Sequence, residues 1–147
     1  MTAAPLTFHT QRRVEFRDTD AAGIVHFSAF FVYMEQAEHE LLRSLGLSVV
    51  THDDEGEIGW PRISAACDFR NPARFEDVLD VEVVIERLGR KSVTYAFRFA
   101  RAGVEIAGTR SIPLVIREAV VDEAVRIASE HGGLFRVIPI RQASSGL

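Results

Sequence analysis

The residues between Ser28 and Gly46 combine helical spacing with a wide apolar face. Apolar side chains, most of them large, recur every three or four positions over roughly five turns. These side chains are Phe30, Phe31, Met34, Ala37, Leu41, Leu42 and Leu45. No glycine or proline interrupts them, Ser28 is the expected N-cap, and Gly46 fits the position just past the helix C-terminus. We expect such a helix to be wrapped by other elements rather than to lie on a surface.

Strand patterns lie on both sides of this helix. Before it, Val14 and Phe16 alternate with charged neighbours, which predicts a half-buried strand over 8–17. Four further strands are predicted over 62–70, 78–88, 92–101 and 104–117. In the last of them, Pro113 indicates a bulge or an edge position. This order predicts an α+β fold in which a five-stranded antiparallel sheet curls around one central helix.

The remaining segments connect or flank these elements. Loops and turns are predicted at 48–60, 89–91 and 102–103. A short helix over 121–128 and a last strand or extended segment over 134–140 are expected near the C-terminus. The chain has 147 residues without an internal repeat or a linker. We therefore expect one domain over 1–147, with flexible tails at 1–7 and 141–147.

Composition and charge narrow the classes of function. The net charge is −4, so no overall basic field attracts nucleic acid. The single cysteine, Cys67, excludes an intramolecular disulfide framework, and we expect it to be a small buried hydrophobe. The first residues lack the basic-then-apolar pattern of a signal peptide, and no apolar run approaches the length of a membrane span. The expectation is a soluble cytoplasmic protein with no nucleic-acid or membrane partner.

We expect the chemistry in the stretch Asp-Thr-Asp-Ala-Ala-Gly-Ile-Val-His-Phe, which leads into the helix. Its apolar second half indicates a partly buried loop. Asp18 and Asp20 need a reason to lie there, because a buried carboxylate is costly unless it is paired or hydrogen-bonded. The loop feeds a helix N-terminus, where free N–H groups and the positive dipole end face any ligand. Two aspartates without a histidine cluster are too few for a dedicated metal site, so no metal is expected.

Three motifs follow one another along the chain. They are Arg-Val-Glu-Phe-Arg-Asp-Thr-Asp-Ala-Ala-Gly-Ile-Val over 13–25, Asn-Pro-Ala-Arg-Phe-Glu-Asp over 71–77 and Arg-Lys-Ser over 90–92. Together they resemble the hotdog-fold acyl-CoA thioesterases, in the branch of the 4-hydroxybenzoyl-CoA thioesterases and YbgC-like proteins. The resemblance implies a hotdog fold and hydrolysis of an acyl-CoA thioester without any cofactor. It also implies a homodimer, associating further to a homotetramer, with the active site at the subunit interface.

The resemblance also assigns roles in the catalytic loop. It places the catalytic carboxylate at Asp20, which acts either as a general base on water or as a nucleophile. A turn-forming role for this aspartate is the alternative. The Phe27 N–H is expected to polarise the thioester carbonyl, and Gly23 to let the backbone approach the ligand. YbgC-like proteins commonly have tyrosine then histidine at 26–27, so a histidine is absent at Phe27, and His26 either compensates or lines the pocket.

Other residues are expected to bind the acyl group. Phe30 and His26 are candidate substrate-binding residues, and the phenylalanines near the site suggest an apolar or aromatic acyl pocket. Glu35 either contacts the acyl group or pairs with His39 one turn later. Glu38 and Glu40 are expected at the surface. The acyl group itself is predicted to be aromatic or a short to medium aliphatic chain.

The phosphates of coenzyme A are expected at the basic turn formed by Arg90, Lys91 and Ser92. Arg70 and Arg74 are alternative phosphate contacts. Two other functions remain open. A hotdog hydratase or dehydratase is suggested by His26 with Glu35, and a non-catalytic acyl-CoA-binding module would explain the absent histidine. Thiol release, hydration of an enoyl-CoA, or binding without turnover distinguishes the three.

Overall fold

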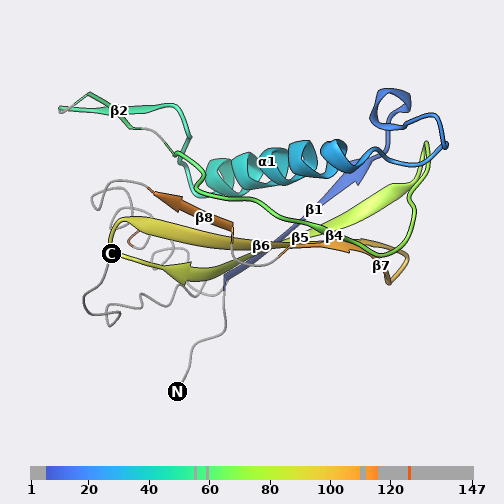
Figure 1. Cartoon of the computed structure of the whole chain (residues 1–147). Helices are drawn as coiled ribbons and strands as arrows, with labels where there is room; N and C mark the ends of the chain where they lie inside the picture. The colour runs from blue at the N-terminus through green and yellow to red at the C-terminus, as the bar shows by residue number, and fades with distance from the viewer. Residues whose placement is uncertain (1–5, 55, 59, 110–111, 116–125, 127–147) are drawn as a thin grey trace, which may run out of the picture.

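One α-helix lies across an antiparallel sheet in the computed structural model (Figure 1), which describes residues 6–54, 56–58, 60–109, 112–115 and 126. The elements are β1 (Leu6–Arg13), the 3₁₀ turn η1 (Phe16–Asp18), α1 (Phe27–Ser44), β2 (Thr51–Asp53), β3 (Gly56–Ile58), β4 (Asp68–Phe69), β5 (Val78–Leu88), β6 (Ser92–Arg101), β7 (Val104–Gly108) and β8 (Ile112–Val115). Within the described residues, no helix is long and apolar enough to cross a bilayer.

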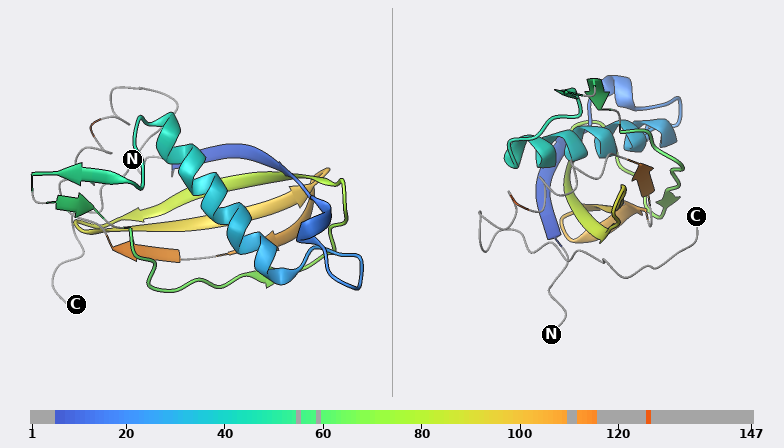
Figure 2. Two further views of the ribbon diagram at one scale, coloured as in Figure 1. Left: turned by 90° about the horizontal axis from the view of Figure 1, so that it is seen from above. Right: turned by 90° about the vertical axis from the view of Figure 1, so that its left-hand side faces the viewer.

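The main sheet has the order β1-β5-β6-β7-β4, and β8 also pairs with β6. All of these pairs are antiparallel, with Thr10 opposite Val81 and Val83 opposite Phe97. The sheet bends around the helix when viewed along its length (Figure 2). The prediction of an antiparallel sheet wrapped around one long helix is therefore confirmed. The small β2–β3 hairpin stands apart from this sheet.

The core forms where the apolar face of α1 meets alternate residues of β5 and β6. The side chains predicted on the helix stripe are buried except Phe31, which is partly buried, and Met34, Ala37 and Leu41 are fully enclosed. The facing strands contribute Leu79, Val81, Val83, Val93, Tyr95, Phe97 and Phe99. This burial accounts for the width of the helix stripe, because the curved sheet contacts the helix over more than one flank.

Two predicted chain reversals are confirmed in detail. Gly46 ends the helix with a positive φ of 72°, and the N–H of Leu47 donates to the carbonyl of Leu42 at 2.8 Å. Between β6 and β7, Ala102 and Gly103 have φ values of 48° and 81°. Two successive positive φ values form the tight turn whose twist suits a β-hairpin.

The first strand is shorter at its C-terminal end than predicted. It ends at Arg13, and Phe16 lies in η1 with its side chain 77% exposed, whereas Val14 is fully buried. The N–H of Glu15 donates to Oδ2 of Asp18 at 2.9 Å and the N–H of Asp18 donates to the Glu15 carbonyl at 3.0 Å. These local bonds replace the sheet ladder, so the predicted strand over 8–17 is wrong beyond Arg13.

Three other boundaries differ from the predictions. The 48–60 loop contains the β2–β3 hairpin, the 62–70 strand is reduced to β4, and the 104–117 strand is divided into β7 and β8. The predicted tail over 1–7 is also wrong at its end, because β1 begins at Leu6. The helix predicted over 121–128 lies outside the described residues apart from position 126, as do the segment 134–140 and the tail 141–147.

Candidate active site

A small closed loop connects η1 to the helix. A β-bridge between Thr19 and Val25 forms its base, and the N–H of Asp20 donates to the Ile24 carbonyl at 2.9 Å. At its tip, Gly23 has φ 77°, a conformation that suits glycine. The Val25 N–H donates to the carbonyl of Ala73 at 2.8 Å, which fixes the loop to the segment before β5. The loop is therefore held by its own backbone and by one neighbouring segment.

Asp20 is partly exposed and is shaped by a turn of its own. Its Oδ1 accepts a hydrogen bond from the N–H of Ala22 at 2.8 Å, which is the turn-forming contact expected of aspartate. Within the described part of the chain, no hydrogen bond reaches Oδ2. The carboxylate is thus oriented through one oxygen, while the other remains available for a proton or a carbon atom.

Asp18 has a structural role, as its two contacts show. Its Oδ2 accepts hydrogen bonds from the backbone of Glu15 at 2.9 Å and from the hydroxyl of Tyr33 at 2.7 Å. The hydroxyl of Tyr33 is a durable donor, because burial and the adjacent Asp18 raise the pKa of Tyr33 well above its ordinary value. Asp18 therefore joins the start of the loop to the helix.

The helix begins two residues earlier than predicted. His26, rather than Ser28, is the N-cap: its Nδ1 accepts from the N–H of Ser28 at 3.2 Å, and the Ser28 hydroxyl lies 2.7 Å from the same nitrogen. The carbonyl of His26 accepts from the N–H of Ala29 at 2.9 Å. A histidine caps here because an unprotonated ring nitrogen accepts in the same way as the usual serine or aspartate oxygen.

The capping contacts leave out the first N–H group of the helix. Among the described residues no acceptor receives a hydrogen bond from the N–H of Phe27, although its neighbours at 28 and 29 are both satisfied. The Phe27 side chain is 61% exposed and its ring stacks on His26, with the centroids 4.4 Å apart. A free backbone donor therefore stands at the positive end of α1, directly after the aspartate loop.

A groove of about 820 Å³ lies between the N-terminal half of α1 and the end of β1. Its lining includes Asp18, His26, Val32 and Gln36, but Asp20, Glu35 and Phe30 do not line it. The groove places His26 beside the side chains of β1 and η1. Within a single chain, the structure thus brings His26 into a groove that Asp20 does not share.

The other predicted acyl-binding residues lie in different surroundings. Phe30 is buried and packs against Phe69 and Phe99, with ring centroids 5.4 Å and 5.3 Å apart. Glu35 is exposed, and within the described residues it forms no ion pair with His39. Phe30 therefore forms the floor beneath the helix start, and Glu35 points toward solvent.

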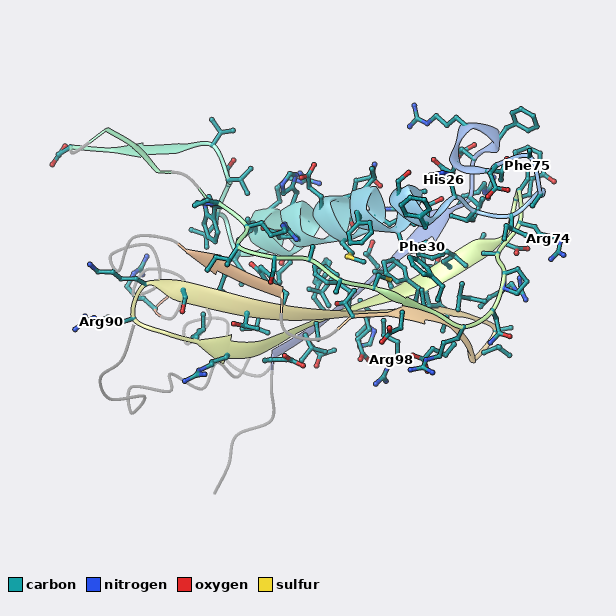
Figure 3. All side chains as sticks on the ribbon, viewed as in Figure 1. His26, Phe30, Arg74, Phe75, Arg90 and Arg98 are labelled. Carbon is teal, nitrogen blue, oxygen red and sulfur yellow. The ribbon has the colours of Figure 1, made fainter. Side chains whose placement is uncertain are left out.

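The predicted coenzyme A contacts lie at the other end of the molecule. Arg90 and His26 are at opposite ends of the sheet (Figure 3). Gly89, Arg90 and Lys91 form the predicted turn between β5 and β6, closed by a 2.8 Å hydrogen bond from the N–H of Gly89 to the Ser92 carbonyl. Arg74 lies at the loop end instead (Figure 3). One chain alone does not bring Arg90, Lys91 and Ser92 together with Asp20 and Phe27.

One residue on α1, Glu38, was placed wrongly by the sequence analysis. Glu38 was expected at the surface but is only 1% exposed, and its carboxylate forms an ion pair with Arg62. Glu40 is partly buried and forms a 2.6 Å ion pair with Arg12 of β1. Glu38 lies within the helix stripe, between buried residues at 34, 37, 41 and 42, so the helical period itself carried the signal.

Cys67 is a poor candidate for a nucleophile, and the described residues offer no candidate metal site. Burial raises the pKa of the Cys67 thiol to about 11, so it stays protonated near neutral pH and is a poor nucleophile. In the described ranges, no group of three or more histidine, cysteine, aspartate or glutamate side chains is arranged to hold a metal ion.

Known proteins are similar to this chain in sequence and in fold. A family model described as the thioesterase superfamily matches residues 22–107. The 1,4-dihydroxy-2-naphthoyl-CoA hydrolase of Synechococcus elongatus is 27% identical over 110 residues, which cover 74% of this chain and 81% of that protein. The match to the family model begins two residues after Asp20 and includes α1, β4, β5, β6 and all but the last residue of β7, while β1 and β8 lie outside it.

Two solved structures are similar in the same way. The BH1999 gentisyl-coenzyme A thioesterase is 33% identical, with a TM-score of 0.67, and the match covers 74% of this chain and 87% of that one. A 4-hydroxybenzoyl CoA thioesterase is 25% identical, with a TM-score of 0.66, and the match covers 76% and 84%. With its sheet wrapped around α1 and most of its length matched, the chain belongs to the thioesterase superfamily and has the hotdog fold.

Proposed function

We propose that the protein hydrolyses the thioester bond of an acyl-CoA, with an aromatic acyl group as its substrate class. The observation that carries this proposal is the free N–H of Phe27 at the start of α1, placed directly after the Asp20 loop. A backbone donor at a helix N-terminus stabilises the negative oxygen that develops when a carbonyl is attacked. Membership of the thioesterase superfamily supports the same chemistry.

In this mechanism the thioester oxygen accepts a hydrogen bond from Phe27 N–H. Asp20 takes a proton from water as the water oxygen bonds to the carbonyl carbon, or its carboxylate attacks that carbon directly. The carbon–sulfur bond then breaks, and coenzyme A leaves as the thiol once it has taken up a proton. In the second route water hydrolyses the mixed anhydride, so both routes yield the same acid and the same thiol.

The aromatic assignment is supported by the relatives and by the surroundings of the helix start. The three similar proteins are named for naphthoyl, gentisyl and hydroxybenzoyl thioesters. In this chain, Phe27 and Phe69 are 61% and 49% exposed beside buried Phe30. Aromatic side chains offer planar apolar surface suited to an aryl ring. A short or medium aliphatic acyl group is the second candidate.

We further propose that two subunits share each active site. His26, which adjoins Phe27 in the chain, lies at one end of the sheet, and Arg90 of the basic turn lies at the other (Figure 3). When two copies pair antiparallel about a two-fold axis, the basic turn of one copy comes beside the aspartate loop of its partner. Arg90 and Lys91 would then bind the coenzyme A phosphates of the thioester at the partner's Asp20.

The test is a panel of acyl-CoA thioesters assayed with a thiol reagent. We expect release of free coenzyme A to be faster from hydroxybenzoyl and dihydroxynaphthoyl esters than from butyryl or octanoyl esters. Faster turnover of the aliphatic esters would replace the aromatic assignment. Hydration of crotonyl-CoA without thiol release would favour a hydratase, and binding without turnover would favour a non-catalytic module.

Complementation tests the shared site. Subunits carrying Asp20→Asn are mixed with subunits carrying Arg90→Ala and Lys91→Ala, and the subunits are allowed to exchange. In a mixed dimer, one of the two sites then combines an intact loop with an intact basic turn. At substrate concentrations well below the KM of the Arg90→Ala, Lys91→Ala parent, we expect the mixture to exceed the activity of either parent. A mixture that stays at the average of its parents would place both groups in one subunit.

A further inference from the structure

The ion pair between Glu38 and Arg62 joins the middle of α1 to the segment 61–67. This segment runs the length of the sheet at the edge opposite β1, from the β2–β3 hairpin to β4 (Figure 2). At its far end β4 pairs with β7 through Asp68 and Phe69. At its near end the guanidinium of Arg62 contacts the carboxylate of Glu38. Between these points the side chain of Ile63 is 64% exposed.

The buried carboxylate of Glu38 restricts where Arg62, and with it the segment 61–67, can lie. Glu38 is 1% exposed and lies among the apolar residues Met34, Leu41 and Leu42, while Arg62 is 27% exposed. Burial raises the pKa of Glu38, an effect that Arg62 opposes. An unpaired charge at such a site is strongly destabilising, whereas the intact pair contributes little more than an apolar replacement would. The pair therefore fixes where Arg62 lies rather than adding much stability.

We propose that the Glu38–Arg62 pair is a positioning device that sets the segment 61–67 for antiparallel pairing with the same segment of a second copy, and so completes the shared active site. The inference rests on the proposed two-subunit site. Neither residue contacts the reacting atoms; both act through the edge they hold. A buried polar pair specifies register, because only one placement of the segment satisfies it.

The occupant of this edge is a second copy of the chain for two reasons. First, the edge is apolar and exposed: Ile63 and Phe69 are 64% and 49% exposed, and Phe27 at the adjacent helix start is 61% exposed. Second, two-fold pairing along this edge places the basic turn of the partner beside the Asp20 loop, which one chain alone leaves distant (Figure 3). An edge that pairs with itself also removes the hazard of an exposed strand.

The chain offers a matched control on the same helix. Glu40 forms an ion pair with Arg12 of β1, on the flank of α1 away from the segment 61–67. Glu38→Gln and Glu40→Gln therefore each remove one charge from α1 and one ion pair from the fold. Only Glu38→Gln removes the ion pair that holds the segment 61–67. A merely structural role predicts that both variants lose stability and that neither changes association.

The measurements are the dimer dissociation constant by sedimentation equilibrium and kcat/KM as a function of protein concentration. We expect Glu38→Gln to raise the dissociation constant by roughly tenfold or more. Its activity should fall at low protein concentration and return toward that of the unchanged protein at high concentration. Glu40→Gln should keep the unchanged dissociation constant. Equal constants for both variants would overturn the proposal.

A double variant covers the case in which Glu38→Gln does not fold. Glu38→Leu with Arg62→Leu replaces the buried pair by apolar side chains, a type of change that often preserves stability. We expect a folded protein that associates more weakly than the unchanged one. Association as tight as before would show that the pair is not needed to set the edge, and would overturn the inference.

The association and activity measurements also distinguish failure of this inference from failure of the proposed function. If the unchanged protein dimerises but releases no thiol from any acyl-CoA, the proposed function fails while the association data still decide the role of Glu38. If it hydrolyses acyl-CoA as a monomer, the edge proposal fails and the thioesterase function stands. Hydrolysis by a monomer would also overturn the shared site, but neither outcome counts against both the thioesterase function and the role of Glu38.

Discussion

The hydroxyl of Tyr33 donates a 2.7 Å hydrogen bond to Oδ2 of Asp18, and this bond connects the second turn of α1 to the turn that precedes the Asp20 loop. The same oxygen accepts the backbone N–H of Glu15. Because Tyr33 is buried, neither partner is readily replaced by water. The position of the Asp20 loop is thus set from the helix side as well as from its own turn.

Replacing Tyr33 by phenylalanine should destabilise the protein by about 1–2 kcal/mol, because it removes this hydrogen bond and leaves the ring in place. Urea unfolding at pH 7 measures the change in the free energy of unfolding. We also expect kcat to fall, since the loop start is no longer fixed. A variant as stable as the unchanged protein would show that solvent replaces the hydroxyl.

Phe27→Pro removes the proposed oxyanion donor without breaking the helix. Phe27 is the first helical residue, where proline is well tolerated, and the preceding His26 has φ −64° and ψ 141°, which suits a residue before proline. We expect kcat to fall by roughly 10²–10³. Phe27→Ala, which keeps the N–H, is the control for loss of the ring. Equal rates for the two variants would remove the backbone donor from the mechanism.

Asp20→Asn should nearly abolish hydrolysis while the protein still folds and binds the acyl-CoA. The amide keeps an oxygen for the N–H of Ala22 but neither accepts a proton from water nor attacks a carbonyl. Stopped assays of thiol release measure the rate, and a binding titration measures the affinity. A variant that retains more than about a tenth of kcat, a loss below about 1.4 kcal/mol, would exclude a catalytic role for Asp20.

Replacing both Arg90 and Lys91 by alanine should raise KM for CoA thioesters with little change in kcat. Binding of remote phosphates stabilises the ground state and the transition state equally. The comparison substrate is a pantetheine thioester of the same acid, which lacks the nucleotide. Its KM should be unaffected, and an equal loss for both substrates would mean that this turn does not bind the phosphates.

Asp77 and Glu38 should give opposite pH dependences of stability. The N–H of Arg74 and the guanidinium of Arg101 lower the pKa of Asp77. Its contribution is therefore present above the ordinary aspartate pKa and is lost as pH falls through the lowered value. Comparing Asp77→Asn with the unchanged protein in urea at several pH values should show a difference that shrinks on acidification.

For Glu38 the sign is reversed. Burial raises the pKa of Glu38, so the folded state takes up a proton before the unfolded state does. Its contribution to stability is full below the ordinary glutamate pKa and declines as pH rises through the raised value. Relative to Glu38→Gln, the unchanged protein should gain stability as pH falls toward that range. A difference independent of pH would mean that Glu38 has an ordinary pKa in the fold.

The spacing of apolar residues predicted the helix and the strands in which a buried apolar face differs clearly from an exposed polar face. The alternation in 78–88 and 92–101 gave the bounds of β5 and β6, and the stripe from Phe30 to Leu45 gave the buried face of α1. The prediction failed at Phe16, because a local capping pattern between Glu15 and Asp18 competes with the sheet and is invisible to an alternation of two.

The site was harder to predict than the fold. Asp20, Gly23 and Phe27 were proposed because they follow one another in a motif, and their catalytic roles stay predictions; the free N–H of Phe27 is compatible with the role expected of it. Glu38 was misplaced because its charge was given more weight than its position on the stripe. The distance between Arg90 and the loop follows from the sheet as a whole, and no local pattern contains it.

Because the proposed donor at position 27 belongs to the main chain, it tolerates substitution of the side chain there. Every residue except proline supplies the N–H found at position 27. Substitutions there by any residue other than proline therefore keep the N–H group, and the side chain can change without loss of the proposed donor. If the Phe27 N–H is the oxyanion donor, the side chains at 26 and 27 can therefore be exchanged to alter the acyl selectivity without removing it.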